Sequence, residues 1–423
     1  MLMKPFASAM PQRRPYVLRL SCNSSTTHAK SPAMKFSSLV ERIGGEGVDA
    51  WRTHSEASAA RDRGEDVIIL SIGDPDINAP EAVVERAVER LRSGDTHYTP
   101  ARGRPALREA IAKAHTERTG QVVRSDNVLC LSGTQNALFV ASMCLAGPGD
   151  EVITFDPLYP TYTATIEVSG ARLVRAPTGA GLRPDVAALE SLVTPRTRAI
   201  FWATPNNPSG VILSEAELAA IGAIARRHDL WIVSDEVYAG LAPGGKVPSL
   251  AATLPERVVT IGSLSKSHSM PGFRAGWLVG PSELAAHAES LSMCMLFGLP
   301  GFIQEAALVA LSIASETERR LREYLDVRRE RFVAGLRGVP NIRVSAPQAG
   351  MFLLLDVNDT GLSGYEFMRA LYERRKVSVL DGAAFGRQTA HFVRLCFATD
   401  EATIDAACAR IRQFCVQDLP GLS

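Results

Sequence analysis

Residues 258–266 read Val-Val-Thr-Ile-Gly-Ser-Leu-Ser-Lys, an apolar run that passes through glycine and serine to Lys266. Four strand-forming residues bounded by glycine and serine predict a buried strand that ends at a turn. The amine of Lys266 would then lie beside hydroxyl groups instead of in open water. Most lysines are solvated surface residues, so the function of this one depends on what lies near it.

Short apolar runs of the same kind recur along the chain, separated by helical patterns. Strands are expected at 128–131, 151–155, 199–203, 231–234 and 258–261, and helices at 81–91 and 106–118. This alternation predicts an α/β fold with a large, doubly wound, mostly parallel sheet. Polar residues and glycines gather directly after the strands, where sheets of this kind bind ligands.

The last hundred or so residues have a different texture. A long charged helix is expected at 316–336, followed by strands at 351–357, 377–380 and 393–397. We interpret the chain as a large ligand-binding domain, residues 78–320, and a smaller α/β domain built from both chain ends, residues 34–77 and 321–423.

The composition narrows the functional classes. The 423 residues are 46% hydrophobic and 22% charged, with a formal net charge of +1. This balance gives no electrostatic footprint for nucleic acid or anionic lipid, and no uncharged apolar run of about 18 residues predicts a membrane span. The seven cysteines are scattered and contain no CxxC pair. They argue against a disulfide framework or a metal site and favour a reducing, cytoplasmic location.

The first 33 residues stand apart because no acidic residue precedes Glu41. Three arginines and several serines in this stretch are typical of an organellar transit peptide. Arginine is common throughout the chain, however, since only seven of its 46 basic residues are lysines. We therefore interpret residues 1–33 as a disordered leader or an over-long start, with a targeting peptide as the alternative.

Two charged residues elsewhere in the chain bear on the interpretation of Lys266. Arg274 follows it by eight residues, and a fixed cation near a reactive lysine suits a phosphate-bearing carbonyl cofactor. Asp235 follows the strand at 231–234, where a buried carboxylate is costly without a partner. A helix cap or a salt bridge would satisfy this carboxylate, and so would a protonated ring nitrogen of a cofactor.

Two turns complete the candidate set. Asn207, within Asn-Asn-Pro-Ser-Gly at 206–210, would be an ordinary turn residue if it stood alone. Gly133-Thr134-Gln135 lies between a strand and a helix, where it forms either a tight turn or a helix N-terminus that presents N–H groups to a phosphate. Each signal is weak by itself, but their joint order is specific.

In this order the residues resemble the class I and II aminotransferases of pyridoxal 5′-phosphate (PLP) fold type I. The resemblance covers nearly all of residues 36–415. The matching residues are Tyr98-Thr99-Pro100 with Gly103, Gly133-Thr134-Gln135, Tyr159, Asn207-Pro208-Ser209-Gly210, Asp235-Glu236-Val237-Tyr238, Ser263-Leu264-Ser265-Lys266, Arg274-Ala275-Gly276 and Arg394.

The resemblance implies a role for each matched residue. Lys266 would bind PLP covalently and carry a proton during the reaction, and Asp235 would pair with the ring nitrogen. The other implied contacts are Tyr159 stacked on the ring, Asn207 and Tyr238 on the ring oxygen, and Gly133, Thr134, Gln135, Ser263 and Arg274 on the phosphate, joined by Tyr98 of a second subunit. Arg394 would bind the substrate α-carboxylate, with Gly73 and Asn207 beside it. The implied enzyme is a homodimer with shared active sites that moves an amino group from an L-amino acid to a 2-oxo acid.

Two positions depart from the family pattern. Pro271 replaces a small or hydroxyl residue, and His268 replaces an aromatic residue two places after the lysine. Neither change removes a catalytic group, and we expect His268 behind the site or on the surface. Two other functions remain open. One is a PLP-dependent β-lyase or synthase of the same fold. The other is a non-enzymatic PLP-sensing regulator, for which the ~33 residues before the matched region would be short for a DNA-binding module.

The substrate side chain is less well determined. Relatives specific for dicarboxylates use an extra arginine from the partner subunit, whereas the corresponding segment, 291–298, contains no cation. Aspartate is therefore disfavoured as the amino donor. The segments 42–47, 50–51, 265–268, 294–298 and 302–304 resemble those of arginine–pyruvate aminotransferases, which implies arginine as donor and pyruvate as acceptor.

A guanidinium that enters an apolar pocket needs an acceptor, and Glu46 and Asp49 lie in the segment that closes over the site in relatives. Glu46 is preferred because glycines flank it; the alternative is that both acids are solvated surface residues. Glu46→Gln should reduce kcat/KM for arginine. The loss of transition-state stabilisation should be about 1–3 kcal/mol, the scale of one charge-assisted hydrogen bond. Alanine is the control donor and should be almost unaffected in the same steady-state assay. Equal losses for both donors would assign Glu46 to loop closure.

Overall fold

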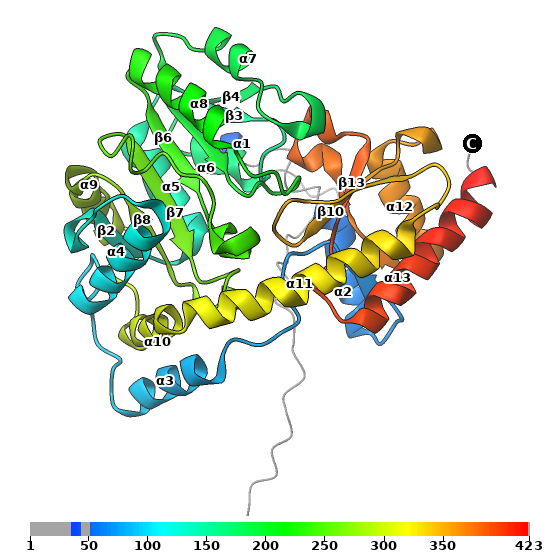
Figure 1. Ribbon diagram of the computed structural model, residues 1–423, viewed down its shortest axis with the longest axis horizontal. Helices are drawn as coiled ribbons and strands as arrows, with labels where there is room; N and C mark the ends of the chain where they lie inside the picture. Colours follow the sequence, from blue (N-terminus) through cyan, green and yellow to red (C-terminus); the bar gives the residue numbers. More distant parts are fainter. Residues whose placement is uncertain (1–34, 44–50, 422–423) are drawn as a thin grey trace, which may run out of the picture.

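The computed structural model describes residues 35–43 and 51–421, and two bodies joined by one long helix are visible in it (Figure 1). Glu46 and Asp49 lie outside the described residues, so their role remains a prediction. Among the helices that are described, none is long and apolar enough to cross a membrane. Within the same residues, no cluster of three or more His, Cys, Asp or Glu side chains is placed to hold a metal ion.

A seven-stranded sheet forms the core of the larger body. Its strands, in order across the sheet, are β2 (Val128–Leu131), β8 (Gly276–Val279), β7 (Val258–Ser263), β6 (Trp231–Asp235), β5 (Thr197–Ala203), β3 (Glu151–Phe155) and β4 (Arg172–Ala176). Neighbouring strands are parallel except at β8, which runs antiparallel to β2 and β7. The predicted doubly wound, mostly parallel sheet is confirmed.

Helices pack on both faces of this sheet (Figure 1). They are α3 (Glu81–Arg92), α4 (Pro105–Thr119), α5 (Gly133–Leu145), α6 (Thr161–Glu167), α7 (Val186–Ser191), α8 (Glu215–Arg227), α9 (Ser282–Met293) and α10 (Gly301–Ser312). Successive residues of a strand point to opposite faces, so Val152 packs in the cluster with α5 whereas Ile153 packs in the cluster with α8. Because both faces are covered, the central strands read as continuous apolar runs.

The smaller body contains a four-stranded antiparallel sheet with the order β12 (Leu380–Asp381), β13 (Phe392–Cys396), β10 (Phe352–Asp356) and β9 (Arg343–Ser345). Beside it, β1 (Ile68–Ile69) pairs in parallel with β11 (Val377–Ser378). Its helices are α2 (Arg52–Asp62), α12 (Gly364–Arg375) and α13 (Glu401–Gln413), while α1 (Ser38–Ile43) contacts α6. Elements from residues 52–69 and 343–413 therefore make up this body, although the exact domain limits stay a prediction.

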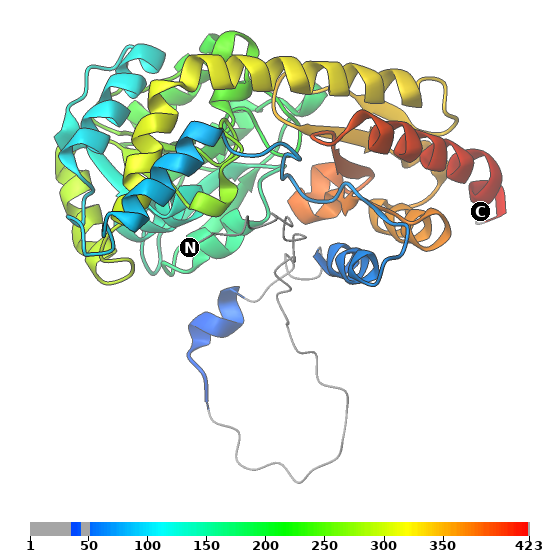
Figure 2. The ribbon, with the colours of Figure 1, turned by 90° about the horizontal axis from the view of Figure 1, so that it is seen from below.

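The long helix α11 (Ala314–Leu336) runs along both bodies in both views (Figures 1 and 2). Its buried Leu321, Leu325 and Phe332 belong to the core of the smaller body. Near its start, Glu318 accepts a hydrogen bond from Arg118 of α4 at 2.9 Å. One continuous helix thus contacts both bodies.

Candidate active site

Three strands deliver polar side chains to one edge of the large sheet. β6 ends at Asp235, β7 ends at Ser263 just before Lys266, and β2 leads directly into the start of α5 at Gly133. These strands run in the same direction, so their carboxyl ends lie at the same edge, where α/β sheets bind ligands. The side chain of Arg394 reaches this edge from β13 of the smaller body and contacts Asn207.

The Lys266 amine lies at the junction of the two bodies. Its Nζ donates a hydrogen bond to the Gly73 carbonyl at 2.6 Å. Burial lowers the pKa of Lys266, and the negative charge of Asp74 opposes this shift. A lower pKa leaves more of the amine neutral near pH 7, and the neutral amine is the form that attacks a carbonyl carbon.

Gly73 is a glycine for a packing reason. A Cβ at this position would collide with the ring of Phe352 from β10. The backbone can therefore pass close to the ring only without a side chain, and this close passage brings the Gly73 carbonyl to Lys266. The predicted approach of the Gly73 backbone to a substrate carboxylate remains a prediction.

Asp235 is buried and has neutral partners. Its Oδ2 accepts a hydrogen bond from the Tyr162 hydroxyl at 2.7 Å, and its Oδ1 accepts one from the Val237 N–H at 3.1 Å. Burial raises the pKa of Asp235 to about 6, and no cation among the described residues opposes that shift. A turn N–H therefore satisfies one oxygen, but the negative charge has no positive partner. A positively charged ring nitrogen would offset the cost of desolvation.

Tyr162 was missed by the sequence analysis. It lies on α6, three residues after Tyr159, and the two rings meet edge to face with centroids 6.2 Å apart. Tyr238 is also buried and packs edge-on against Phe352 at 6.0 Å. Burial raises the pKa of all three tyrosines, so each hydroxyl stays protonated and able to donate a hydrogen bond.

The start of α5 forms an anion cradle with Arg274. Gly133 has φ +81°, and a Cβ there would collide with the Arg274 guanidinium. Arg274 itself adopts a left-handed conformation at φ +53° and donates hydrogen bonds to the carbonyls of Pro271 at 2.9 Å and Ser132 at 3.2 Å. An exposed guanidinium beside the N-terminus of a 13-residue helix is suited to a phosphate.

Two of the predicted phosphate contacts differ in how they are held. The Thr134 hydroxyl donates to the Ser263 Oγ at 2.9 Å, which joins the cradle to the end of β7. The Gln135 side chain instead accepts from Thr161 and donates to Thr165 on α6. Its amide is therefore occupied, and only the backbone N–H of Gln135 points to the helix start, as in any first helical turn.

Arg394 carries a charge that no described carboxylate compensates. It is 1% exposed, and its Nη1 and Nη2 donate to the Asn207 Oδ1 at 3.0 Å and the Ser71 carbonyl at 2.6 Å. Its Nε has no hydrogen-bond partner among the described residues. Burial lowers the pKa of Arg394, and no Asp or Glu of the described chain is close enough to oppose this shift. The guanidinium lies 4.0 Å from the ring centroid of Phe352. This apolar neighbour does not neutralise the charge, so the site is suited to an anionic ligand.

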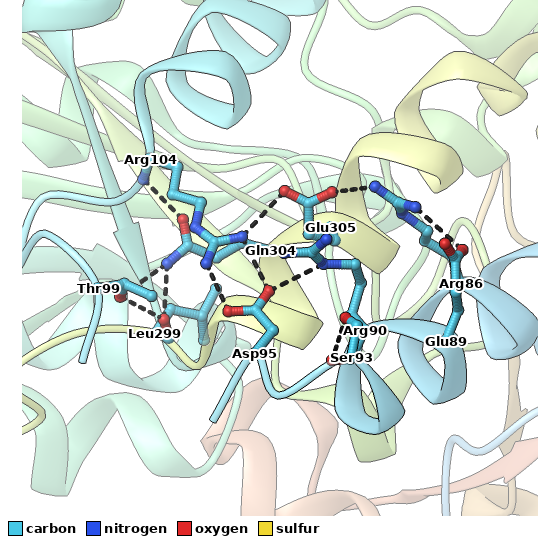
Figure 3. A network of polar contacts seen from close by, with 10 residues as sticks. All are labelled: Arg86, Glu89, Arg90, Ser93, Asp95, Thr99, Arg104, Leu299, Gln304 and Glu305. Atoms are coloured by element: carbon cyan, nitrogen blue, oxygen red, sulfur yellow. Dashed lines mark hydrogen bonds and ion pairs between the residues drawn. The ribbon is translucent and has the colours of Figure 1, made fainter. Parts of the chain in front are cut away.

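Tyr98, the predicted phosphate contact of the second subunit, lies on the surface of this chain. It is 88% exposed, and its ring packs on Phe297 with centroids 4.8 Å apart. Buried Gln304 fixes the loop below it by donating to the Leu299 carbonyl at 2.6 Å and to Thr99 Oγ1 at 3.0 Å (Figure 3). Large aromatic rings on a firmly held loop are typical of an interface with another molecule.

The ion pairs in Figure 3 extend this support to neighbouring helices. Arg104 donates to both carboxylate oxygens of Asp95, at 2.5 and 2.9 Å, and to Glu305 of α10 at 3.0 Å. Glu305 also pairs with Arg86 of α3 at 2.5 Å. Ion pairs thus connect the loop that carries Tyr98 to both α10 and α3.

His268 lies behind the lysine turn and is 1% exposed, so the surface alternative is wrong. Its Nε2 donates to the Ala310 carbonyl at 3.0 Å, and its Nδ1 accepts from Ser267 at 2.8 Å. Burial lowers the pKa of His268 to about 4. It is therefore a neutral tether between the Lys266 turn and α10.

This geometry agrees with the result of sequence comparison. The profile of a family described as "Aminotransferase class I and II" matches residues 65–411. The chain belongs to this family. The aminotransferase is 42% identical over 393 residues to the arginine–pyruvate transaminase AruH of Pseudomonas aeruginosa, a match that covers 92% of this chain and 100% of AruH. It is 32% identical over 355 residues to an aspartate aminotransferase of Pyrococcus horikoshii, covering 82% of this chain and 90% of that one.

Solved structures give the same result for the fold of the aminotransferase. Aspartate aminotransferase of Thermus thermophilus with maleate has a TM-score of 0.85 at 29% identity, covering 90% of this chain and 100% of that one. The Thermotoga maritima enzyme has a TM-score of 0.82 at 32% identity, covering 90% and 99%. The predicted family, fold and transaminase activity are confirmed, and enzymes of this family depend on PLP. These relatives give no support to the lyase and regulator alternatives.

Proposed function

We propose that this aminotransferase binds PLP through Lys266 and transfers the amino group of L-arginine to pyruvate. The observation that supports an amino-acid substrate is the state of Arg394. Its guanidinium is buried, and among the described residues its Nε has no hydrogen-bond partner and no carboxylate pairs with it. A carboxylate that accepts two parallel hydrogen bonds is the natural complement of such a group. Every α-amino acid and every 2-oxo acid contains such a carboxylate.

The uncompensated charges of the site fit PLP at three points. The buried negative charge of Asp235 suits the protonated ring nitrogen, and the cradle of Gly133 and Arg274 suits the phosphate. The partly neutral amine of Lys266 suits the aldehyde carbon. The buried hydroxyl of Tyr238 and the amide of Asn207 would then face the ring oxygen, and Tyr159 the ring face. The donor set matches the cofactor that the family uses.

When bound, PLP stabilises the electron pair left on the substrate carbon after its proton departs. The chain's own residues do the rest. Arg394 fixes the substrate carboxylate, which orients the Cα–H bond toward the Lys266 amine. Lys266 Nζ accepts that proton and returns it later in the reaction, a task that its lowered pKa favours. The negative charge of Asp235 keeps the ring nitrogen protonated.

The proposed donor rests on the 42% identity to the arginine–pyruvate transaminase and on the chemistry of one segment. Around the end of α9, the side chains of Met293, Met295 and Phe297 are partly exposed, and no cation occurs between residues 291 and 298. Flexible methionines accommodate a long aliphatic stem, and an aromatic face attracts a guanidinium. Such a segment would not neutralise the second carboxylate of aspartate.

We further propose that the enzyme is a cytoplasmic homodimer with a large PLP-binding domain, residues 78–320, and a small domain, residues 34–77 and 321–423. The dimer is supported by the exposed rings of Tyr98 and Phe297, which meet on two loops joined through Gln304. Tyr98 would reach the phosphate of the neighbouring subunit, which explains why it lies on the surface of its own chain.

The cofactor assignment is tested by covalent trapping. Purified enzyme should be yellow, and borohydride should fix the cofactor to the peptide that contains Lys266, as read by mass spectrometry. Lys266→Ala should show no fixed label, and labelling of another lysine would overturn the assignment. An activity panel of donors against oxo acids tests the substrate separately: arginine with pyruvate should lead, and no arginine activity in a labelled enzyme would end the substrate proposal alone.

Shared sites are tested by mixing variants. A hybrid of Lys266→Ala and Tyr98→Ala subunits should contain one site with both defects and one intact site, so co-refolded or co-expressed variants should recover about half of the parent activity per hybrid dimer. The control hybrid, Lys266→Ala with Asp235→Ala, should recover none, because both residues serve the same subunit. Equal failure of the two hybrids would contradict the sharing of Tyr98.

A further inference from the structure

The segment from Ser71 to Pro75 supports both charged groups of the site yet has little backbone support of its own. The Ser71 carbonyl accepts from Arg394, and the Gly73 carbonyl accepts from Lys266. The last ladder bond before this segment is from the Leu70 N–H to the Ser378 carbonyl at 2.8 Å, and the next backbone bond is from the Asp76 N–H to Ala398 at 3.2 Å. Among the described residues, no N–H between 71 and 75 bonds to another backbone carbonyl. Side chains must therefore hold this segment.

The Ser71 hydroxyl is the centre of that support. It is fully buried and lies 2.9 Å from His54 Nδ1 and 3.0 Å from the Ser378 hydroxyl, which is also fully buried. A buried hydroxyl with two partners has one preferred position. The held hydroxyl restrains the backbone of Ser71. The backbone carbonyl of Ser71 accepts a hydrogen bond from Arg394 at 2.6 Å and so orients the guanidinium.

His54 comes from α2, a helix that contributes no contact to the proposed cofactor. Its ring is half-buried and meets Trp51 edge to face at 5.9 Å. Burial and the nearby positive charges of Arg61 and Arg394 lower the pKa of His54. The ring is therefore neutral near pH 7 and acts as a hydrogen-bond partner, not as a charge beside Arg394.

We propose that His54 is a positioning residue for the carboxylate of the substrate, acting through the Ser71 hydroxyl on the carbonyl that orients Arg394. This inference rests on the proposed role of Arg394 as the carboxylate-binding residue. Because the carboxylate is common to donor and acceptor, His54 affects the binding of every substrate equally, whatever its side chain. The effect on Lys266 should be smaller, since its amine bonds to a different carbonyl, that of Gly73.

The test compares His54→Leu with His54→Asn. Leucine removes the hydrogen bond, whereas an asparagine side-chain atom can occupy the position of Nδ1. His54→Leu should raise KM for arginine, alanine and pyruvate by about tenfold, the equivalent of one hydrogen bond, with kcat within about twofold. The inhibition constant of butanoate, a carboxylate without an amine, should rise by the same factor. His54→Asn should restore all four values to within about threefold of the parent.

Ser71→Ala is the second variant and keeps the proposal testable if His54→Leu does not fold. It should reproduce the KM increase, and the double variant His54→Leu/Ser71→Ala should be no worse than either single variant, because both break one chain of contacts. Parent-like KM and butanoate inhibition in Ser71→Ala or His54→Leu would overturn the inference, and so would a loss confined to kcat or a failure of asparagine to rescue.

Arg394→Lys separates this inference from the function on which it rests. If Arg394→Lys weakens butanoate inhibition strongly and the His54 variants do not, only the role of His54 fails. If Arg394→Lys also leaves butanoate inhibition unchanged, the carboxylate role of Arg394 fails, and the role of His54 fails with it.

Discussion

A guanidinium buried without a carboxylate is the constraint on which this site depends. Removing a charge from water costs several kcal/mol unless hydrogen bonds and an opposite charge replace the lost hydration. Arg394 has two neutral acceptors and two aromatic rings around it, and its Nε has no partner in the described chain. The buried charge therefore lowers the stability of the fold, and an anionic group of the proposed substrate would offset that cost.

The same principle explains the other half of the site. Asp235 is a buried anion whose partners are a tyrosine hydroxyl and a backbone N–H. Arg394 lies in an antiparallel strand of one body and Asp235 at the end of a parallel strand of the other, and no ion pair joins these two described residues. A molecule with a positive ring nitrogen at one end and a carboxylate at the other satisfies both. The proposed cofactor and its substrate would supply these two charges together. Gly73 makes room for the Phe352 ring, and Gly133 makes room for the Arg274 guanidinium.

The sequence predicted the parts whose signals are local. β2 and β3 were predicted to the residue because both are buried throughout, whereas β8 was missed because a glycine and a partly exposed tryptophan interrupt its apolar pattern. The resemblance to the aminotransferase family implied that Lys266, Asp235 and Arg394 share one site. It could not find Tyr162, His54 or Ser71, since their importance lies in partners 73 residues away for Tyr162 and 307 for Ser71. Such contacts leave no pattern in the neighbouring sequence.

The most direct measurement of the central claim is the thermal unfolding of Arg394→Met with and without butanoate. Methionine keeps an unbranched stem without the charge, so the variant without ligand should unfold at the same temperature as the parent or above it, because the uncompensated charge is gone. Butanoate should raise the midpoint of the parent by mass action and leave that of the variant unchanged. A variant that unfolds well below the parent, or that is still stabilised by butanoate, would show that Arg394 is a structural residue and would contradict the account.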